Sequence, residues 1–244
     1  MSPAGDFDGQ TVIVTGAARG IGEATAKGFA DLGASVWMVD SDEEALIPAA
    51  EAAGAFAAVA DVSSTADVER VVAEAVQETG RIDVLFNNAG VLRDKVLWKI
   101  EDADWDLVVN VSLGGTFKFT RACVPHFRER GYGRVINITS YTGLHGNVGQ
   151  AAYAAAKAGV IGFTKTAAKE LARFGVTVNA ISPNAQTRMI DSIPDHIREG
   201  LDALIPLGRF ADPKEIVPGV LFLASQAAGY VTGVVLPVDG GIAM

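Results

Sequence analysis

Tyr153 and Lys157 lie four residues apart in the segment "YAAAK", separated only by alanines. The surrounding run is rich in alanine and Gly175 follows it, which predicts a helix over about 151–174. Residues four apart share a helix face, so the phenol and the ammonium should project together. A free tyrosine has a pKa of about 10, and a fixed ammonium beside it favours the phenolate and lowers that pKa. Such a pair could exchange a proton with an alcohol or a ketone, although most short motifs of this kind are surface decoration.

Ser140 ends the predicted strand "RVINITS" and precedes Tyr153 by thirteen residues. At the carboxyl end of a parallel strand, its hydroxyl could hydrogen-bond the same substrate oxygen as Tyr153. Proton transfer beside a bound nicotinamide indicates hydride transfer, in which the cofactor carries the chemistry and the protein orients it. The pair is therefore an acid/base device on the condition that a dinucleotide lies next to it.

A dinucleotide site is predicted by "TGAARGIG", which follows the first strand and opens a helix. Gly16, Gly20 and Gly22 allow the backbone to turn tightly and to approach a pyrophosphate closely. The helix beginning near Gly20 offers unpaired N–H groups and the positive end of its dipole to that anion. A glycine-rich turn without a ligand is the alternative, and the position between strand and helix favours the ligand.

Asp40 ends the second strand, "SVWMVD", about where an acid contacts the adenosine ribose in such folds. A carboxylate there accepts hydrogen bonds from the 2′-hydroxyl and repels a 2′-phosphate, which predicts NAD as the cofactor. Arg19 acts in the opposite direction because it could pair with that phosphate, but Ser41 adds no positive charge and Asp40 would face the ribose directly. Asp40 could instead be a helix N-terminal acid. Asp61 is either a partner of the adenine amino group or, equally, a helix cap.

Strands and helices alternate almost from end to end. Strands are predicted at 11–16, 35–40, 56–62, 82–90, 134–140, 176–182 and 234–241, with helices at 21–33, 41–54 (Ser41 its possible N-cap), 63–80, 102–130, 151–174 and 213–225. Helix-length segments between strands imply a parallel sheet covered on both faces. We predict a single α/β domain over 1–244, a Rossmann-type doubly wound sheet of seven parallel strands with helices on both faces. The irregular stretch 184–211 is predicted to be a substrate loop, because long loops in compact domains are usually functional.

Composition limits the classes of partner and compartment. The net charge of -9 and pI near 4.8 argue against nucleic acid, since phosphate binding needs a basic surface. One cysteine, Cys123, excludes an internal disulfide, and no histidine and carboxylate spacing forms a convincing metal site. The first residues lack the apolar run of a signal peptide, and no stretch of about 18 apolar residues predicts a membrane span. We therefore expect a cytoplasmic protein.

Taken together, the motifs resemble those of the short-chain dehydrogenase/reductase family along nearly the whole chain. The matching segments are "TGAARGIG", "NNAG", Asn110, Ser140 with "YAAAK", and "VNAISP", and their combination in this order is specific although each alone is weak. The resemblance implies that Tyr153 is the general acid/base and that Ser140 positions the substrate carbonyl. It also implies that Lys157 binds the nicotinamide ribose and that Asn110 holds a water connecting the lysine to solvent.

The predicted cofactor contacts come partly from the motifs and partly from the family resemblance. The segment "NNAG" ends the fourth strand at the same edge, where small residues suit a strand end passing under a cofactor, although an ordinary turn is the alternative. The resemblance assigns Thr187, after the sixth strand, to the nicotinamide carboxamide. The full predicted set is Gly16, Arg19, Gly20, Ile21, Gly22, Asp40, Asp61, Val62, Asn88, Ala89, Gly90, Tyr153, Lys157, Pro183 and Thr187.

The substrate is less sharply indicated. The segments "NNAGVLRDK", "GNVGQAAY" and "SPNAQTRM" look most like 3-hydroxyacyl-CoA dehydrogenase domains, some of which also oxidise 17β-hydroxysteroids. The later segment "PLGRFADPKEIVPGVLFLAS" looks equally like 3-oxoacyl-carrier-protein reductases, which usually prefer NADP, and Asp40 argues against that preference here. Asn184 departs from the glycine usual after Pro183. His145, five residues after Ser140, could line the substrate pocket.

We therefore expect an NAD(H)-dependent oxidoreductase that interconverts a secondary alcohol and a ketone, most simply in a 3-hydroxyacyl or 3-oxoacyl thioester. A hydroxysteroid or other apolar alcohol is the alternative substrate. A dinucleotide-binding regulator without catalysis is the alternative of another class, and the presence of both Tyr153 and Lys157 argues against it. The resemblance further implies a homotetramer in which the helices at 102–130 and 151–174 pack across subunits.

Overall fold

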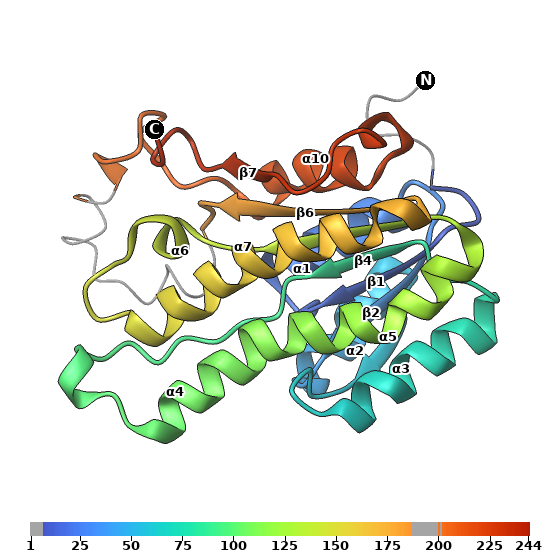
Figure 1. The fold of residues 1–244 in the computed structure, drawn as a ribbon, viewed down its shortest axis with the longest axis horizontal. Coiled ribbons are helices and arrows are strands. Elements are labelled where there is room, and N and C mark those ends of the chain that lie inside the picture. The colour runs from blue at the N-terminus through green and yellow to red at the C-terminus, as the bar shows by residue number, and fades with distance from the viewer. Residues whose placement is uncertain (1–6, 187–199, 201) are drawn as a thin grey trace.

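The computed structural model describes residues 7–186, 200 and 202–244. Seven parallel strands form one sheet, as the sequence predicts, and their order is β3-β2-β1-β4-β5-β6-β7 (Figure 1). The strands are β1 (Thr11–Thr15), β2 (Ser35–Asp40), β3 (Phe56–Val59), β4 (Val84–Asn87), β5 (Gly133–Ile138), β6 (Val176–Pro183) and β7 (Val235–Val238). The order changes direction at β1, whose neighbours are β2 and β4, so the switch point lies between β1 and β4.

Helices cover both faces of the sheet. They are α1 (Gly20–Ala30), α2 (Glu43–Ala53), α3 (Thr65–Thr79), α4 (Asp102–Val109), α5 (Gly115–Arg130), α6 (Tyr141–His145), α7 (Ala151–Leu171) and α10 (Pro213–Ala224), with shorter turns such as η1 (Leu97–Lys99) and η2 (Asn110–Gly114). Buried residues of α1, α2 and α10 share one core cluster with the strands, whereas those of α3, α5 and α7 share the other. Figure 1 shows α3, α5 and α7 crossing in front of the strands.

Strand β1 shows how the sequence divides between the two cores. All of its residues are buried, and Val12 and Val14 belong to the core under α1 while Ile13 belongs to the opposite core. Alternate side chains of a strand point to opposite faces, so a strand covered on both sides must be apolar at every position. This requirement explains the continuous β-branched runs that predict the strands.

Two local predictions differ from the structure. The helix predicted over 102–130 is divided, because the π-helical turn η2 separates α4 from α5. Helix α2 is capped by Asp42, whose side chain accepts a hydrogen bond from the N–H of Ala45, so Ser41 is not its N-cap. Both serine and aspartate are good N-caps, and the residue one position later makes the contact here. Within the described part of the chain, no helix combines the length and apolar character needed to cross a membrane.

Asp83 joins three strands at the amino edge of the sheet. Its carboxylate is fully buried and accepts hydrogen bonds from the N–H of Thr11 at 2.9 Å and from Nε of Arg81 at 2.7 Å. Nε of Arg130 lies 3.4 Å from the same carboxylate, and the Asp83 carbonyl accepts from the N–H of Arg134. A buried charge is costly unless it has such partners. Removing the Asp83 carboxylate would leave the buried N–H of Thr11 without a hydrogen-bond acceptor.

We expect Asp83→Ala to lower the free energy of unfolding by about 2–4 kcal/mol, because a buried N–H and two guanidinium groups lose their acceptor. The measurement is chemical denaturation followed by circular dichroism at one fixed protein concentration. Asp31→Ala is the matched control, since the exposed Lys27–Asp31 pair contributes less than about 1 kcal/mol. Equal destabilisation by the two variants would contradict the role given to Asp83.

Candidate active site

The glycine-rich turn lies at the carboxyl end of β1, against the end of β4. Gly16 has φ 64°, and a Cβ on Gly22 would overlap the carbonyl oxygen of Gly16. Nδ2 of Asn88 donates to the carbonyls of Thr15 and Gly16 at 3.1 and 2.9 Å, which fixes the turn to β4. The turn therefore requires glycine where the sequence has it, because any side chain at Gly22 would push the backbone apart.

The amino end of α1 is open to an anion. Arg19 occupies the N-cap position, and its side chain makes no capping hydrogen bond with the first-turn amides of the helix. The N–H groups and the helix dipole favour negative charge at this position. The tight glycine backbone and the uncapped helix end fit a dinucleotide pyrophosphate.

Asp40 holds the glycine-rich turn to the end of β2. One carboxylate oxygen accepts from the N–H of Ala18 and the other from the N–H of Asp42, both at 3.1 Å. Asp40 lies just before α2, the helix whose N-cap is Asp42, and its carboxylate binds the glycine-rich turn as well as the Asp42 N–H. The guanidinium of Arg19 lies 2.7 Å from the Asp42 carboxylate, so its charge already has a partner on the protein.

Asp61 and Val62 border the adenine side of the predicted site. The Asp61 carboxylate accepts from the N–H of Ser63 at 2.8 Å, while Ser64 is the N-cap of α3. Asp61 therefore shapes the turn before α3 without capping the helix itself. Val62 is buried, and a Cβ on Gly115 would clash with its side chain, so it packs closely against the start of α5.

The side chain of Thr15, at the end of β1, holds the segment after β4 in place. The sequence motifs did not single this residue out. Its hydroxyl oxygen accepts from the N–H groups of Asn88 and Ala89 at 3.0 and 3.2 Å. Gly90 lies next to the Lys157 ammonium, because a Cβ on Gly90 would lie 3.5 Å from Nζ of Lys157. A small polar residue at the end of the first strand does not by itself predict a functional role. Only the strand order, with β1 beside β4, shows that Thr15 contacts the segment after β4.

Ser140, Tyr153 and Lys157 come together at the carboxyl end of β5. The Ser140 side chain is close enough to that of Tyr153 to lower its pKa, and Nζ of Lys157 lies 5.7 Å from the centre of the Tyr153 ring. Lys157 is buried and donates to the carbonyl of Ile138 at 2.8 Å. The Thr139 hydroxyl donates to the Lys157 carbonyl at 2.8 Å, which ties α7 to the strand end.

Burial shifts the pKa values of both groups away from their charged forms. Loss of water contact raises the pKa of Tyr153 to about 12, while the hydrogen bond from Ser140 lowers it and the charge of Asp94 raises it further. Burial lowers the pKa of Lys157 to about 8. The expectation of a lowered Tyr153 pKa is therefore wrong for the protein groups alone, because desolvation of the phenolate is the largest cause of the shift and Lys157 is not among its causes.

Asn110 begins the π-helical turn between α4 and α5. The N–H of Gly115 reaches back to the carbonyls of Asn110 and Val111, which widens the helix at this point. Such turns are rare and recur at functional sites. Between Asn110 and Lys157 the described structure gives no direct hydrogen bond, so a link between them would need an intervening group such as water.

The segment after β6 is described only in part. Pro183 ends β6, and Asn184 is bound to the neighbouring strand through its N–H, which donates to the carbonyl of Val238 at 3.1 Å. Thr187 and most of the predicted substrate loop lie outside the described residues. His145 is exposed, and its ring lies 4.6 Å from that of Tyr141 in α6. Among the described residues, no group of three or more potential ligands could hold a metal ion.

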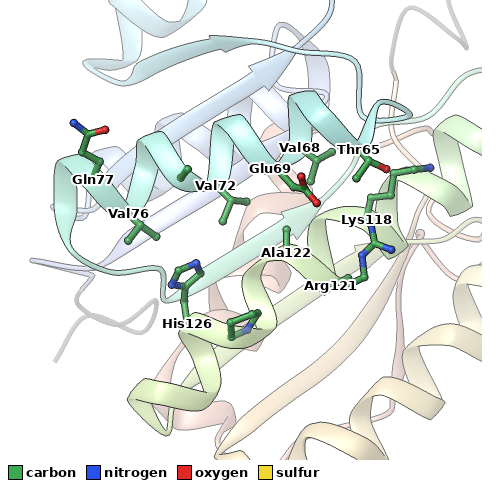
Figure 2. Close-up of a pocket in the computed structure, with 12 residues that line it drawn as sticks. Thr65, Val68, Glu69, Val72, Val76, Gln77, Lys118, Arg121, Ala122 and His126 are labelled. Carbon is green, nitrogen blue, oxygen red and sulfur yellow. The ribbon is translucent and has the colours of Figure 1, made fainter.

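A separate hollow of about 590 Å³ lies between α3 and α5. Val68, Val72 and Val76 line it from α3 and Ala122 from α5, with His126 near one end (Figure 2). None of the predicted site residues lines it. This hollow is therefore distinct from the site at the carboxyl edge of the sheet.

Comparison with known proteins agrees with the geometry. A family model described as enoyl-(acyl carrier protein) reductase matches residues 16–243. A 3-oxoacyl-[acyl-carrier-protein] reductase, FabG, of Thermotoga maritima is 43% identical over 242 residues, covering 97% of this chain and 98% of that protein. The corresponding reductase of Escherichia coli K12 is 39% identical and covers 98% of this chain and 99% of that protein.

Two further relatives carry other names. A (2S)-[(R)-hydroxy(phenyl)methyl]succinyl-CoA dehydrogenase subunit of Thauera aromatica is 42% identical and covers 95% of this chain and 96% of that protein. A solved structure from Agrobacterium tumefaciens, provisionally assigned as a gluconate dehydrogenase, superposes with a TM-score of 0.93 at 32% identity, covering 98% of this chain and 97% of that one. The chain therefore belongs to the short-chain dehydrogenase/reductase family, whose members are oxidoreductases that bind a nicotinamide dinucleotide.

Proposed function

We propose that this protein is an NAD(H)-dependent reductase and dehydrogenase that interconverts a 3-oxoacyl thioester and the corresponding 3-hydroxyacyl thioester. The observation that carries the proposal is the hydroxyl pair of Tyr153 and Ser140 beside the buried Lys157, at the same sheet edge as the glycine-rich turn. Relatives named for 3-oxoacyl-carrier-protein and acyl-CoA substrates, at 39% to 43% identity, support the thioester class.

When bound against the glycine-rich turn, a reduced nicotinamide cofactor would supply the hydride for reduction of the ketone. Tyr153 is protonated at neutral pH because burial raises its pKa to about 12, so it can donate its proton to the ketone oxygen as negative charge develops there. Ser140 hydrogen-bonds the same oxygen and orients it.

Lys157 would stabilise the negative charge that remains on the Tyr153 oxygen after this residue has donated its proton. Burial lowers the pKa of Lys157 to about 8, so the ammonium remains mostly charged at neutral pH. It stabilises the phenolate and, next to Gly90, can hydrogen-bond the nicotinamide ribose. Asn110 would connect this lysine to solvent through water and so return a proton to the site.

NAD is the proposed cofactor because the ribose end of the site carries a carboxylate. Asp40 lies at the end of β2 against the glycine-rich turn, and the charge of Arg19 is already paired with Asp42. The remaining predicted contacts are those named from the sequence, including Thr187 for the nicotinamide carboxamide. A hydroxysteroid or another apolar alcohol remains the alternative substrate, and a regulator without catalysis the alternative class.

Self-association is also proposed, with a homotetramer as the expected form. Phe117 of α5 is 43% exposed and meets Phe163 of α7 edge-to-face with ring centres 6.4 Å apart. Trp105 of α4 is 40% exposed. Aromatic side chains on the outer faces of α4 and α5 would be removed from water if these helices packed against a second subunit.

A substrate comparison tests the proposed reaction. We expect reduction of acetoacetyl-CoA with kcat/KM at least about tenfold above that for a ketosteroid or an oxidised sugar acid, because the thioester fits the proposed class. Spectrophotometric oxidation of the reduced cofactor measures each rate under the same conditions. Efficient turnover of the sugar acid or of its alcohol, without activity on the thioester, would refute the proposed substrate class.

A tyrosine substitution tests the mechanism. Tyr153→Phe should lower kcat by at least about a hundredfold because the proton donor is lost, while the dissociation constant of the cofactor changes little. Lys157→Ala should weaken both turnover and cofactor binding, since the ammonium serves both. Steady-state kinetics and fluorescence titration with NADH separate the two effects. Wild-type turnover by Tyr153→Phe would show that another group transfers the proton.

Cofactor preference tests Asp40. Two like charges about 4 Å apart at an effective dielectric of about 20 repel by about 4 kcal/mol, and solvent reduces this value. A residual of about 2 kcal/mol is about thirtyfold, so we expect NAD to be preferred over NADP by at least about tenfold in kcat/KM. Asp40→Ala should shrink the preference, and Asp40→Ala with Ser41→Arg should reverse it by supplying a phosphate partner. Equal use of both cofactors by the wild type would mean that Arg19 outweighs Asp40.

A further inference from the structure

The loop after β4 brings a carboxylate close to the proposed catalytic hydroxyls. The N–H of Lys95 donates to the carbonyl of Gly149 at 2.9 Å, and Lys95 forms a parallel bridge with Gln150. Gln150 is the N-cap residue of α7 and precedes Tyr153 by three positions. The neighbouring Asp94 accepts a hydrogen bond from Nε2 of Gln150 at 2.9 Å. Asp94 is therefore attached to the same helix end that carries the proton donor.

Gln150 links this carboxylate to the rest of the site. Its Oε1 accepts from the Thr142 hydroxyl and from Nδ2 of Asn147, both at 3.0 Å. The N–H of Thr142 in turn donates to the Ser140 hydroxyl at 3.2 Å. Asp94 is thus held by a chain of hydrogen bonds that ends at one of the two hydroxyls proposed to bind the ketone.

The nearby cations are bound elsewhere. Nζ of Lys95 lies 2.6 Å from the Asp104 carboxylate and 3.5 Å from that of Glu101, and Nε of Arg93 lies 3.8 Å from Asp104. The part of the chain that the structure describes gives Asp94 no cationic partner. The negative charge of Asp94 also acts on the phenol of Tyr153, since it is one of the causes that raise the pKa of this residue.

We propose that Asp94 is a specificity residue that rejects substrates with a free carboxylate beside the reacting ketone and admits neutral esters and thioesters. The inference rests on the proposed function and assigns one residue to its choice of substrate. In a 3-oxo acid only one carbon separates the ketone from the carboxylate, so binding the ketone at Tyr153 brings the carboxylate into the field of Asp94. A thioester at the same position carries no charge. Asp94 is exposed, so solvent screens the repulsion of an acid and the expected effect is a modest change in substrate ratio.

Ethyl acetoacetate and acetoacetate form a matched pair of probes, because they share the ketone and differ in charge at the neighbouring group. We expect the wild type to prefer the ester in kcat/KM. Asp94→Asn should reduce the ester-to-acid ratio by at least about fivefold, because a like-charge interaction over several ångströms is lost. The amide oxygen of the new side chain can still accept from Gln150, so the hydrogen bond is retained.

Two further variants separate charge from packing. Asp94→Glu keeps the charge and should keep most of the preference for the ester. Glu101→Gln is the control, because it removes an exposed carboxylate of the same region that pairs with Lys95, and the ratio should stay within about twofold of the wild type. An unchanged ratio in Asp94→Asn, or equal losses toward both probes, would overturn the charge role of Asp94.

Turnover of acetoacetyl-CoA in the same assay reports separately on the proposed function. A wild type that reduces the thioester while Asp94→Asn keeps the wild-type ratio would overturn only the specificity role. A wild type that reduces neither the thioester nor the ester would overturn the proposed function, and the inference about Asp94 with it. Reduction of the thioester together with a shrunken ratio in Asp94→Asn would support both.

Discussion

The parallel direction of all seven strands is the constraint on which the site depends. Parallel strands place their carboxyl ends along one edge, so residues far apart in the chain meet there without any local signal between them. Gly16 follows β1, Asp40 ends β2, Gly90 follows β4 and Ser140 follows β5. The opposite edge is closed by Asp83, whose buried carboxylate contacts β1 and receives two arginines. One edge is thus fixed by buried ion pairs, and the other leaves helix ends and hydroxyls free to bind.

Burial governs the electrostatics of the catalytic groups. Removing water from Tyr153 and Lys157 favours the neutral form of each, so the phenol keeps its proton and the amine holds its proton less firmly than in water. A neutral phenol is the form that can donate a proton during ketone reduction. The reverse oxidation needs the phenolate, which the protein groups alone disfavour, and the positive charge of an oxidised nicotinamide would favour it.

Most of the fold and the positions of the site residues follow from the sequence. Continuous β-branched runs predict buried parallel strands, and glycines at 16, 20 and 22 predict a turn that the structure forms with Gly22 against Gly16. The spacing of Tyr153 and Lys157 predicts a shared helix face but contains no information on burial, which is why the direction of the Tyr153 pKa shift is wrong. The π-helical turn that begins at Asn110 places Leu113 close against Gly159 of α7, and no residue pattern in the sequence predicts it.

Contacts between side chains of separate loops are the least predictable part of the site, and they decide its selectivity. Asp40 anchors the glycine-rich turn through Ala18 and ends β2 at the proposed ribose position, so the proposed cofactor preference would be coupled to the shape of the turn. Asp94 repeats this arrangement at the substrate side, since its hydrogen bond to Gln150 fixes the start of α7 while its charge faces the proton donor. Asp40 accepts hydrogen bonds through both carboxylate oxygens and Asp94 accepts one from Gln150, so contacts with the protein orient each charge. The proposed selection by charge would therefore use residues that also hold the two loops in place.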